Sequence, residues 1–199
     1  MFVKICGLST SEAVETSVAA GANALGFVFA PSPRQVSPDL AYALCRNLRD
    51  DVIRVAVMHH PTVEEWTKVR TLFAPDWLQT DTEDFNKLDL EDCKPLPVFR
   101  TRLNLSEDRW PARMLFESSH SGSGEKADWQ EAAWMATKTR VILAGGLNSS
   151  NIVKAVQSVK PWGVDVSSGV ESARGIKDQK KIRGFIAQVR SMENNDGAR

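Results

Sequence analysis

The sequence has little cysteine, and its few cysteines are not arranged for a disulfide framework or a zinc site. Cys6, Cys45 and Cys93 are the only three in 199 residues. They are odd in number, far apart and without CxxC spacing, which excludes the usual pattern of either kind of site. We therefore expect a protein of a reducing compartment, the cytoplasm, without a metal.

The chain also lacks an excess of charge and a long apolar run. Its 25 Lys and Arg residues balance 25 Asp and Glu residues, so no overall positive field exists to hold nucleic acid or an anionic membrane. The apolar start at Phe2–Cys6 becomes polar at Ser9 before a signal-peptide core could develop. We expect an unexported, soluble protein that binds neither nucleic acid nor membrane, although a small anion could bind locally.

Short apolar runs rich in β-branched residues alternate with stretches of helical periodicity along the chain, which is typical of repeated β-α units. The helical stretches include Ser11–Ala20, Pro38–Asn47 and Val63–Leu72. The candidate strands are Phe2–Cys6, Ala24–Phe29, Ile53–Val57, Trp77–Gln79, Pro97–Arg100, Arg113–Glu117, Val141–Ala144 and Gly163–Val166.

So many strands in a short chain favour an α/β fold of one domain, a closed (β/α)8 TIM barrel over residues 1–190 with a flexible C-terminal tail at 191–199. An open doubly wound sheet usually has a glycine-rich loop after its first strand, and Cys6-Gly7-Leu8-Ser9 does not match that GxGxxG pattern. Pro95 and Pro97 make residues 84–108 the stretch where we expect irregular structure. In a barrel, functional residues follow the strands.

Two glycine-rich loops follow the seventh and eighth predicted strands. Gly145 and Gly146 come after the seventh strand, and Ser168 and Gly169 come after the eighth. Either loop alone is equally well explained as a tight turn. Barrels frequently bind phosphate with these two loops, so together they predict a site where backbone N–H groups hold a phosphorylated small molecule.

Several motifs together resemble those of the phosphoribosylanthranilate isomerases. The KICG start and the VDVSSGVE block are the most specific of them, and the resemblance runs from Lys4 to about Phe185. In the family's order, the matching segments are Lys4–Leu8, Gly21–Phe29, Ser32–Arg34, Ser121–Gly124, Asp128–Trp129, Leu143–Asn148, Asn151, Gly163–Glu171 and Gly175–Asp178.

Two positions depart from the family's pattern. The family usually has Gln-Leu-His-Gly after the fourth strand, whereas this chain has Asp81 in place of the histidine. The family usually has an aspartate after the sixth strand as general acid, where this chain has Glu117. We interpret Glu117 as a conservative replacement that keeps the carboxyl chemistry. The role of Asp81 in substrate binding is open.

The resemblance implies an Amadori rearrangement without metal or redox cofactor, in tryptophan biosynthesis, with Cys6 as general base and Glu117 as general acid. A thiol base needs nearby positive charge or N–H donors. The acid must hold its proton near neutral pH, which burial or a neighbouring carboxylate such as Asp165 would favour. Arg34, after the second strand, is the expected partner of the substrate's anthranilate carboxylate.

Other interpretations stay open at this point. A second phosphosugar enzyme on a barrel would place a carboxylate at Cys6 or would need a catalytic lysine and an N-terminal extension, and neither is found. A phosphate-ligand binding protein without activity is made conceivable by the two departures. His59 and His60 could bind a metal, but a solvated loop is the better interpretation of two adjacent histidines. Both a monomer and a homodimer are compatible with the sequence.

Overall fold

The computed structural model describes residues 1–101, 110–118 and 126–196. Parallel strands β1 to β8 pair in chain order, and β8 pairs with β1 to close the sheet. The predicted barrel is confirmed, and each predicted strand is present. The bounds are β1 Phe2–Cys6, β2 Ala24–Val28, β3 Ile53–Val57, β4 Trp77–Asp81, β5 Lys94–Phe99, β6 Arg113–Phe116, β7 Arg140–Leu143 and β8 Gly163–Val166.

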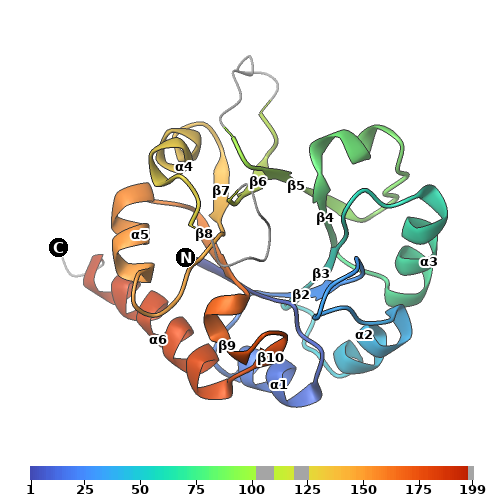
Figure 1. Ribbon diagram of the computed structural model, residues 1–199, viewed down its shortest axis with the longest axis horizontal. Helices are drawn as coiled ribbons and strands as arrows, with labels where there is room; N and C mark the ends of the chain where they lie inside the picture. The colour runs from blue at the N-terminus through green and yellow to red at the C-terminus, as the bar shows by residue number, and fades with distance from the viewer. Residues whose placement is uncertain (102–109, 119–125, 197–199) are drawn as a thin grey trace.

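Helices surround the barrel as an outer ring (Figure 1). Several begin at a side chain that accepts a backbone hydrogen bond, and Thr62 forms a full capping box with Glu65. Such caps give a backbone N–H group of the first turn a hydrogen-bond partner and so fix where each helix starts. The helices are α1 Ser11–Ala19, α2 Pro38–Cys45, α3 Val63–Phe73, α4 Trp129–Ala136, α5 Ile152–Val159 and α6 Gln179–Asp196, with 3₁₀ turns η1 Thr82–Asn86 and η3 Ser168–Val170.

The apolar side chains form two cores. The larger core lies between the strands and the helices, and the smaller core fills the inside of the barrel with residues such as Val55, Leu96 and Leu115. Phe2 stacks on Trp77 and on Trp162, all at strand starts, so aromatic rings close the N-terminal end of the barrel. The opposite end is left open for a site.

The stretch around the two prolines is more regular than the sequence predicted. Residues 82–86 form η1, and β5 begins at Lys94 rather than at Pro97. The Phe99 carbonyl oxygen accepts a hydrogen bond from Glu117 N–H on the side of β5 that faces β6. Lys94 N–H donates to the Asp76 carbonyl oxygen on the other side, which faces β4. Backbone N–H groups point alternately to the two neighbouring strands, so the positions of Pro95 and Pro97, which lack an N–H group, face β6. The hydrogen bonds between β4 and β5 are therefore kept. The expectation of irregular structure was wrong for this strand.

The last helix continues beyond the boundary that we expected at residue 190. It runs to Asp196, Met192 packs against the larger core, and Glu193 pairs with Arg190 and with the N-terminal ammonium. The barrel fold therefore includes residues that we had placed in the tail. The predicted end of this tail, 197–199, lies outside the described residues.

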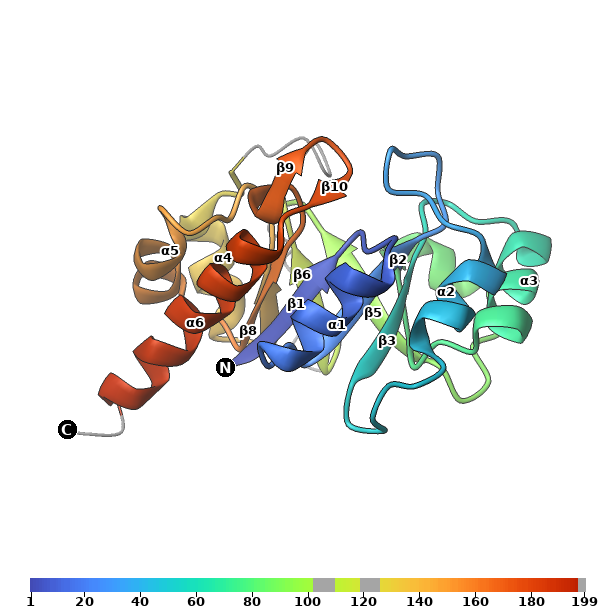
Figure 2. The ribbon, with the colours of Figure 1, turned by 90° about the horizontal axis from the view of Figure 1, so that it is seen from below.

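A short hairpin, β9 Glu171–Ala173 and β10 Ile176–Lys177, stands on the barrel rim away from the N-terminus (Figure 2). It follows β8 and η3 directly, so it lies beside the loops where the site was predicted. Within the described part of the chain, none of the helices combines the length and the apolar character that crossing a membrane requires.

Candidate active site

A cavity of about 700 Å³ opens at the C-terminal ends of the strands. Eight of the nine residues predicted for the site lie along its wall or floor, and Ser168 is one of the eight. The other seven are Cys6, Arg34, Asp81, Glu117, Gly145, Gly146 and Asp165, while Gly169 does not line the cavity. Strands β1 and β6 lie on different sides of the barrel, so Cys6 and Glu117 reach one space from different directions.

Lys4 and Asp165 form a buried ion pair beneath Cys6. The Lys4 side chain is fully buried, and its Nζ donates to Oδ1 of Asp165 at 2.8 Å. Lys4 and Asp165 are register partners on β1 and β8, and Lys4 and Cys6 share one face of β1 because side chains alternate along a strand. Burial acts to lower the pKa of Lys4, but Asp165 and Cys6 outweigh it and raise this pKa.

Burial dominates the environment of the Cys6 thiol. The residue is 7% exposed, and this burial raises the pKa of Cys6 above its ordinary value, with the positive charges of Lys4 and Lys177 acting in the opposite direction. The expected cations are therefore present. They reduce the cost of forming a thiolate without making the thiolate the main form at neutral pH.

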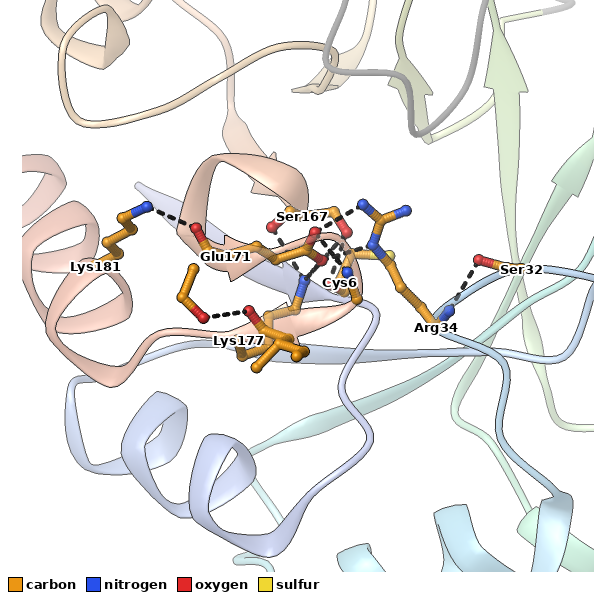
Figure 3. A network of polar contacts seen from close by, with 10 residues as sticks. Cys6, Ser32, Arg34, Ser167, Glu171, Lys177 and Lys181 are labelled. Carbon is orange, nitrogen blue, oxygen red and sulfur yellow. Dashed lines mark hydrogen bonds and ion pairs between the residues drawn. The ribbon is translucent and has the colours of Figure 1, made fainter.

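Arg34 is held by Glu171 rather than left free (Figure 3). Its Nε and Nη2 donate to the two carboxylate oxygens at 2.6 and 2.9 Å. Lys177 donates to the same carboxylate at 2.8 Å, and Gly175 N–H donates at 3.1 Å. Burial alone would raise the pKa of Glu171, but these donors lower it to about 2. Among the described residues Nη1 of Arg34 has no partner, so one donor group stays available at the cavity wall.

Arg100, directly after β5, joins two acids of the site. Its Nη2 lies 3.1 Å from Oε1 of Glu117, and its Nη1 contacts Oδ1 of Asp81. A guanidinium at this distance stabilises an ionised carboxylate, the form that cannot donate a proton. The sequence suggested Asp165 as the neighbour that would keep Glu117 protonated. In the structure Asp165 pairs with Lys4 and a cation contacts Glu117.

The two glycine-rich loops pack against each other. Gly145 and Gly146 have φ angles of 82° and 62°, which favour glycine. Among the described residues, no acceptor is found for their N–H groups. A Cβ at Gly169 would lie 1.9 Å from the Leu147 carbonyl oxygen, so only glycine allows this approach. Gly169 therefore serves the contact between the loops, and the pair Gly145-Gly146 offers donors to the cavity.

Sequence reasoning missed four charged residues of the site: Lys4, Arg100, Glu171 and Lys177. A signal existed for Lys4, because a lysine inside an apolar strand two positions before Cys6 must share its face. Glu171 and Lys177 lie in segments that match the family, and Arg100 ends a predicted strand. The roles of these three residues nevertheless depend on partners on other strands and loops. The Ser121–Gly124 motif of the resemblance lies outside the described residues.

Known proteins resemble this chain over nearly its whole length. The family model for N-(5'-phosphoribosyl)anthranilate (PRA) isomerase matches residues 3–188. The chain belongs to this family. An isomerase of that name from Roseiflexus sp. (strain RS-1) is 38% identical over 209 residues, covering 95% of this chain and 97% of the relative.

Solved structures of PRA isomerases agree in fold. The enzyme from Thermus thermophilus superposes with a TM-score of 0.83 at 31% identity, covering 96% of this chain and 100% of that one. A PRA isomerase in complex with reduced 1-(o-carboxyphenylamino)-1-deoxyribulose 5-phosphate superposes with a TM-score of 0.78 at 28% identity, covering 96% and 99%. That relative therefore binds a phosphorylated product analogue on the same barrel.

Proposed function

We propose that this PRA isomerase converts N-(5'-phosphoribosyl)anthranilate into 1-(2-carboxyphenylamino)-1-deoxyribulose 5-phosphate in L-tryptophan biosynthesis, by general acid-base catalysis with Cys6 and Glu117. The observation that supports these roles is the shared cavity, which the thiol and the carboxyl group enter from β1 and β6. Proton transfer to one side of a sugar and from the other needs this arrangement. We expect the enzyme to act in the cytoplasm, as a monomer or a homodimer.

Glu117 is the proposed acid. Protonation of the furanose ring oxygen by Glu117 breaks the bond between that oxygen and C1', and the nitrogen lone pair forms the Schiff base. Arg100 at 3.1 Å opposes the protonated form of Glu117 in the free protein. A substrate anion that drew Arg100 toward itself would release Glu117 to take up its proton.

Cys6 is the proposed base. Its thiolate removes the proton from C2', and the electron pair of that bond moves to form the enolamine, which then becomes the ketone. Lys4 and Lys177 supply the positive charge that a thiolate needs. Because burial raises the pKa of Cys6, the thiolate is scarce but strongly basic.

The remaining site residues are assigned to substrate binding. The N–H groups of Gly145 and Gly146, with Ser168 of the neighbouring loop, hold the phosphate, and Gly169 supports this site by letting the two loops meet. Arg34 offers Nη1 to the anthranilate carboxylate while Glu171 fixes its orientation.

Asp81 and Asp165 both line the cavity, and each keeps one oxygen on a cation. Their second oxygens are the proposed acceptors for substrate hydroxyl groups, since a carboxylate can accept several hydrogen bonds at once.

Replacement of either proton-transfer group tests the proposal. Cys6→Ala and Glu117→Gln should each reduce kcat by about 10²- to 10⁴-fold or more, measured as the loss of substrate anthranilate fluorescence. The thiolate fraction of Cys6 in the wild-type protein should increase with pH above neutrality, because burial raises the pKa of this thiol, and the rate of its alkylation by iodoacetamide measures that fraction.

Binding and background serve as controls for this experiment. Both variants should bind inorganic phosphate as the wild type does, because neither residue belongs to the glycine-rich loops. Cys45→Ala replaces another buried cysteine, in α2 and away from the cavity, and should keep wild-type kcat. A fully active Glu117→Gln variant would move the acid to another residue, and an active Cys6→Ala variant would remove the thiol from the mechanism.

A further inference from the structure

Two histidines and a carboxylate meet at the rim of the cavity. His59 and His60 follow β3, and Asp81 ends the neighbouring strand β4. Oδ2 of Asp81 lies 3.8 Å from Nε2 of His59 and 3.7 Å from Nε2 of His60. One ligand atom from each of the three residues falls within 4.8 Å of the others. The histidine side chains are 60% and 48% exposed, so they can adjust.

The second ring nitrogen of His60 is held by a buried acid. Nδ1 of His60 lies 3.3 Å from Oδ1 of Asp84, whose carboxylate also accepts from Thr80 Oγ1 at 2.6 Å and pairs with Lys87 at 3.2 Å. An ionised carboxylate only accepts, so the proton of a neutral His60 sits on Nδ1. The lone pair of Nε2 then faces Asp81. A carboxylate behind a histidine is the usual support of a metal ligand.

We propose that His59, His60 and Asp81 bind a divalent transition-metal ion such as Zn²⁺ at the cavity rim. Two imidazole nitrogens and one carboxylate oxygen suit zinc, with a fourth position left for water. Zinc bonds of about 2.0–2.2 Å place tetrahedral ligands roughly 3.3 Å apart. The two separations between Asp81 and the histidines must therefore shrink by about half an ångström, and the two histidine nitrogens, now within 4.8 Å of each other, must also approach. Arg100 holds the other oxygen of Asp81 and opposes a cation, which favours a reversible site.

A bound ion would lower isomerase turnover, and this part of the inference rests on the proposed function. His59 and Asp81 both line the cavity, so the ion would narrow the entrance. It would also compete with Arg100 for Asp81, which leaves the guanidinium more firmly on Glu117. Both effects act against substrate binding and against protonation of the acid.

Calorimetric titration of the metal-stripped protein with ZnCl₂ tests binding without any use of activity, and the visible absorption of Co²⁺ gives a second readout. We expect one site per chain.

His60→Asn should weaken Zn²⁺ binding at least tenfold, and asparagine suits this position because His60 has a φ of 46°. His120→Asn replaces the third histidine of the chain and should bind Zn²⁺ as the wild type does. Cys6→Ala should also keep the site, which excludes the thiol as its main ligand.

The outcomes separate the two parts of the inference. Absence of Zn²⁺ binding to the wild type at millimolar concentration, or unchanged binding by His60→Asn, would overturn the metal site. Zn²⁺ should reduce wild-type turnover several-fold and leave His60→Asn nearly unaffected. Binding without inhibition would overturn the regulatory part alone. If the protein had no isomerase activity, the proposed function would fail while the calorimetric result still decided the site.

Discussion

At the scale of single residues, the charged side chains beneath the cavity are held by opposite charges. Glu171 receives two bonds from Arg34, one from Lys177 and one from a backbone N–H group. Removal of one member of such a buried set leaves the others without a counter-charge. Glu171 therefore fixes Arg34 at the cavity and contributes to the stability of the fold.

The stability that Glu171 supplies should depend on pH. Its pKa is about 2 in the folded protein, below its ordinary value, so its contribution is present above the ordinary pKa of a glutamate and is lost as the pH falls toward 2. Glu171→Gln should lower the free energy of unfolding by about 3 kcal/mol at pH 7, and by much less near pH 2.

Urea unfolding of both proteins between pH 7 and pH 2 checks this expectation. Glu64→Gln, at an exposed position in the first turn of α3, is the control and should change the free energy of unfolding little at any pH. A difference between wild type and Glu171→Gln that stayed constant over this range would show that ionisation of Glu171 is not what stabilises the fold.

Residue roles could be predicted from the sequence only where they follow from a strand end or a motif. Cys6 ends the first predicted strand and Glu117 ends the sixth, so their convergence at the mouth of a barrel could be expected. Arg100 also ends a strand, but its role depends on Asp81 and Glu117 standing on either side of it. Such a contact joins three strands, and no local pattern encodes it.

At the scale of elements, the loops after β7 and β8, where we propose the phosphate site, are in contact. Gly169 allows the closest approach, because its missing side chain leaves room for the Leu147 carbonyl. Asn151 fixes the first loop by donating to the Gly146 carbonyl at 2.8 Å and accepting from Asn148 N–H at 2.9 Å. The conformation of each loop thus depends on the other.

Gly169→Ala should separate these loops. A Cβ 1.9 Å from a carbonyl oxygen requires backbone movement, and we expect a loss of about 2 kcal/mol in the free energy of unfolding and weaker binding of inorganic phosphate. Urea unfolding and phosphate titration measure the two effects. Gly184→Ala in α6 is the matched control, since its Cβ would meet nothing within 4 Å. It should stabilise by about 0.5–1 kcal/mol. Equal stability and equal phosphate binding of the two variants would contradict the proposed importance of the loop contact.

Element types could be predicted more securely than element bounds. The predicted strands follow from apolar runs, and all are found. The prolines of β5 suggested irregular structure because proline lacks a donor. The positions of β4 and β6 are needed to see that these prolines leave the hydrogen bonds between β4 and β5 intact. The fold extends past the expected boundary at residue 190 because the polar end of α6 gains contacts with the N-terminus.

At the scale of the whole molecule, the last helix fastens the start of the chain to the barrel. Arg190 donates to the carbonyl oxygens of Met1 and Gly21 and to Oδ1 of Asn23. Asn23 in turn accepts from Val3 N–H in β1. One side chain of α6 therefore connects the start of β1 with the loop that follows α1 and leads into β2.

Arg190→Met should destabilise the whole barrel in one transition. It removes several hydrogen bonds to partly buried acceptors, which we expect to cost about 2 kcal/mol in the free energy of unfolding. Denaturant unfolding followed by fluorescence and by circular dichroism checks the magnitude and the single transition. Arg49→Met removes an exposed pair with Asp51 and should change stability by less than about 0.5 kcal/mol. Early loss of α6 alone would contradict the coupling.

The pairing of β1 with β8 also constrains how the protein is made. Lys4 and Asp165 are partners in the sheet although 161 positions separate them. During synthesis the first strand must wait for the last one, with its outer hydrogen-bonding groups unsatisfied on one side. Until then the growing chain presents an open edge to other nascent chains. The outer edge of β1 at this seam is therefore the strand edge that stays unpaired longest while the chain is made.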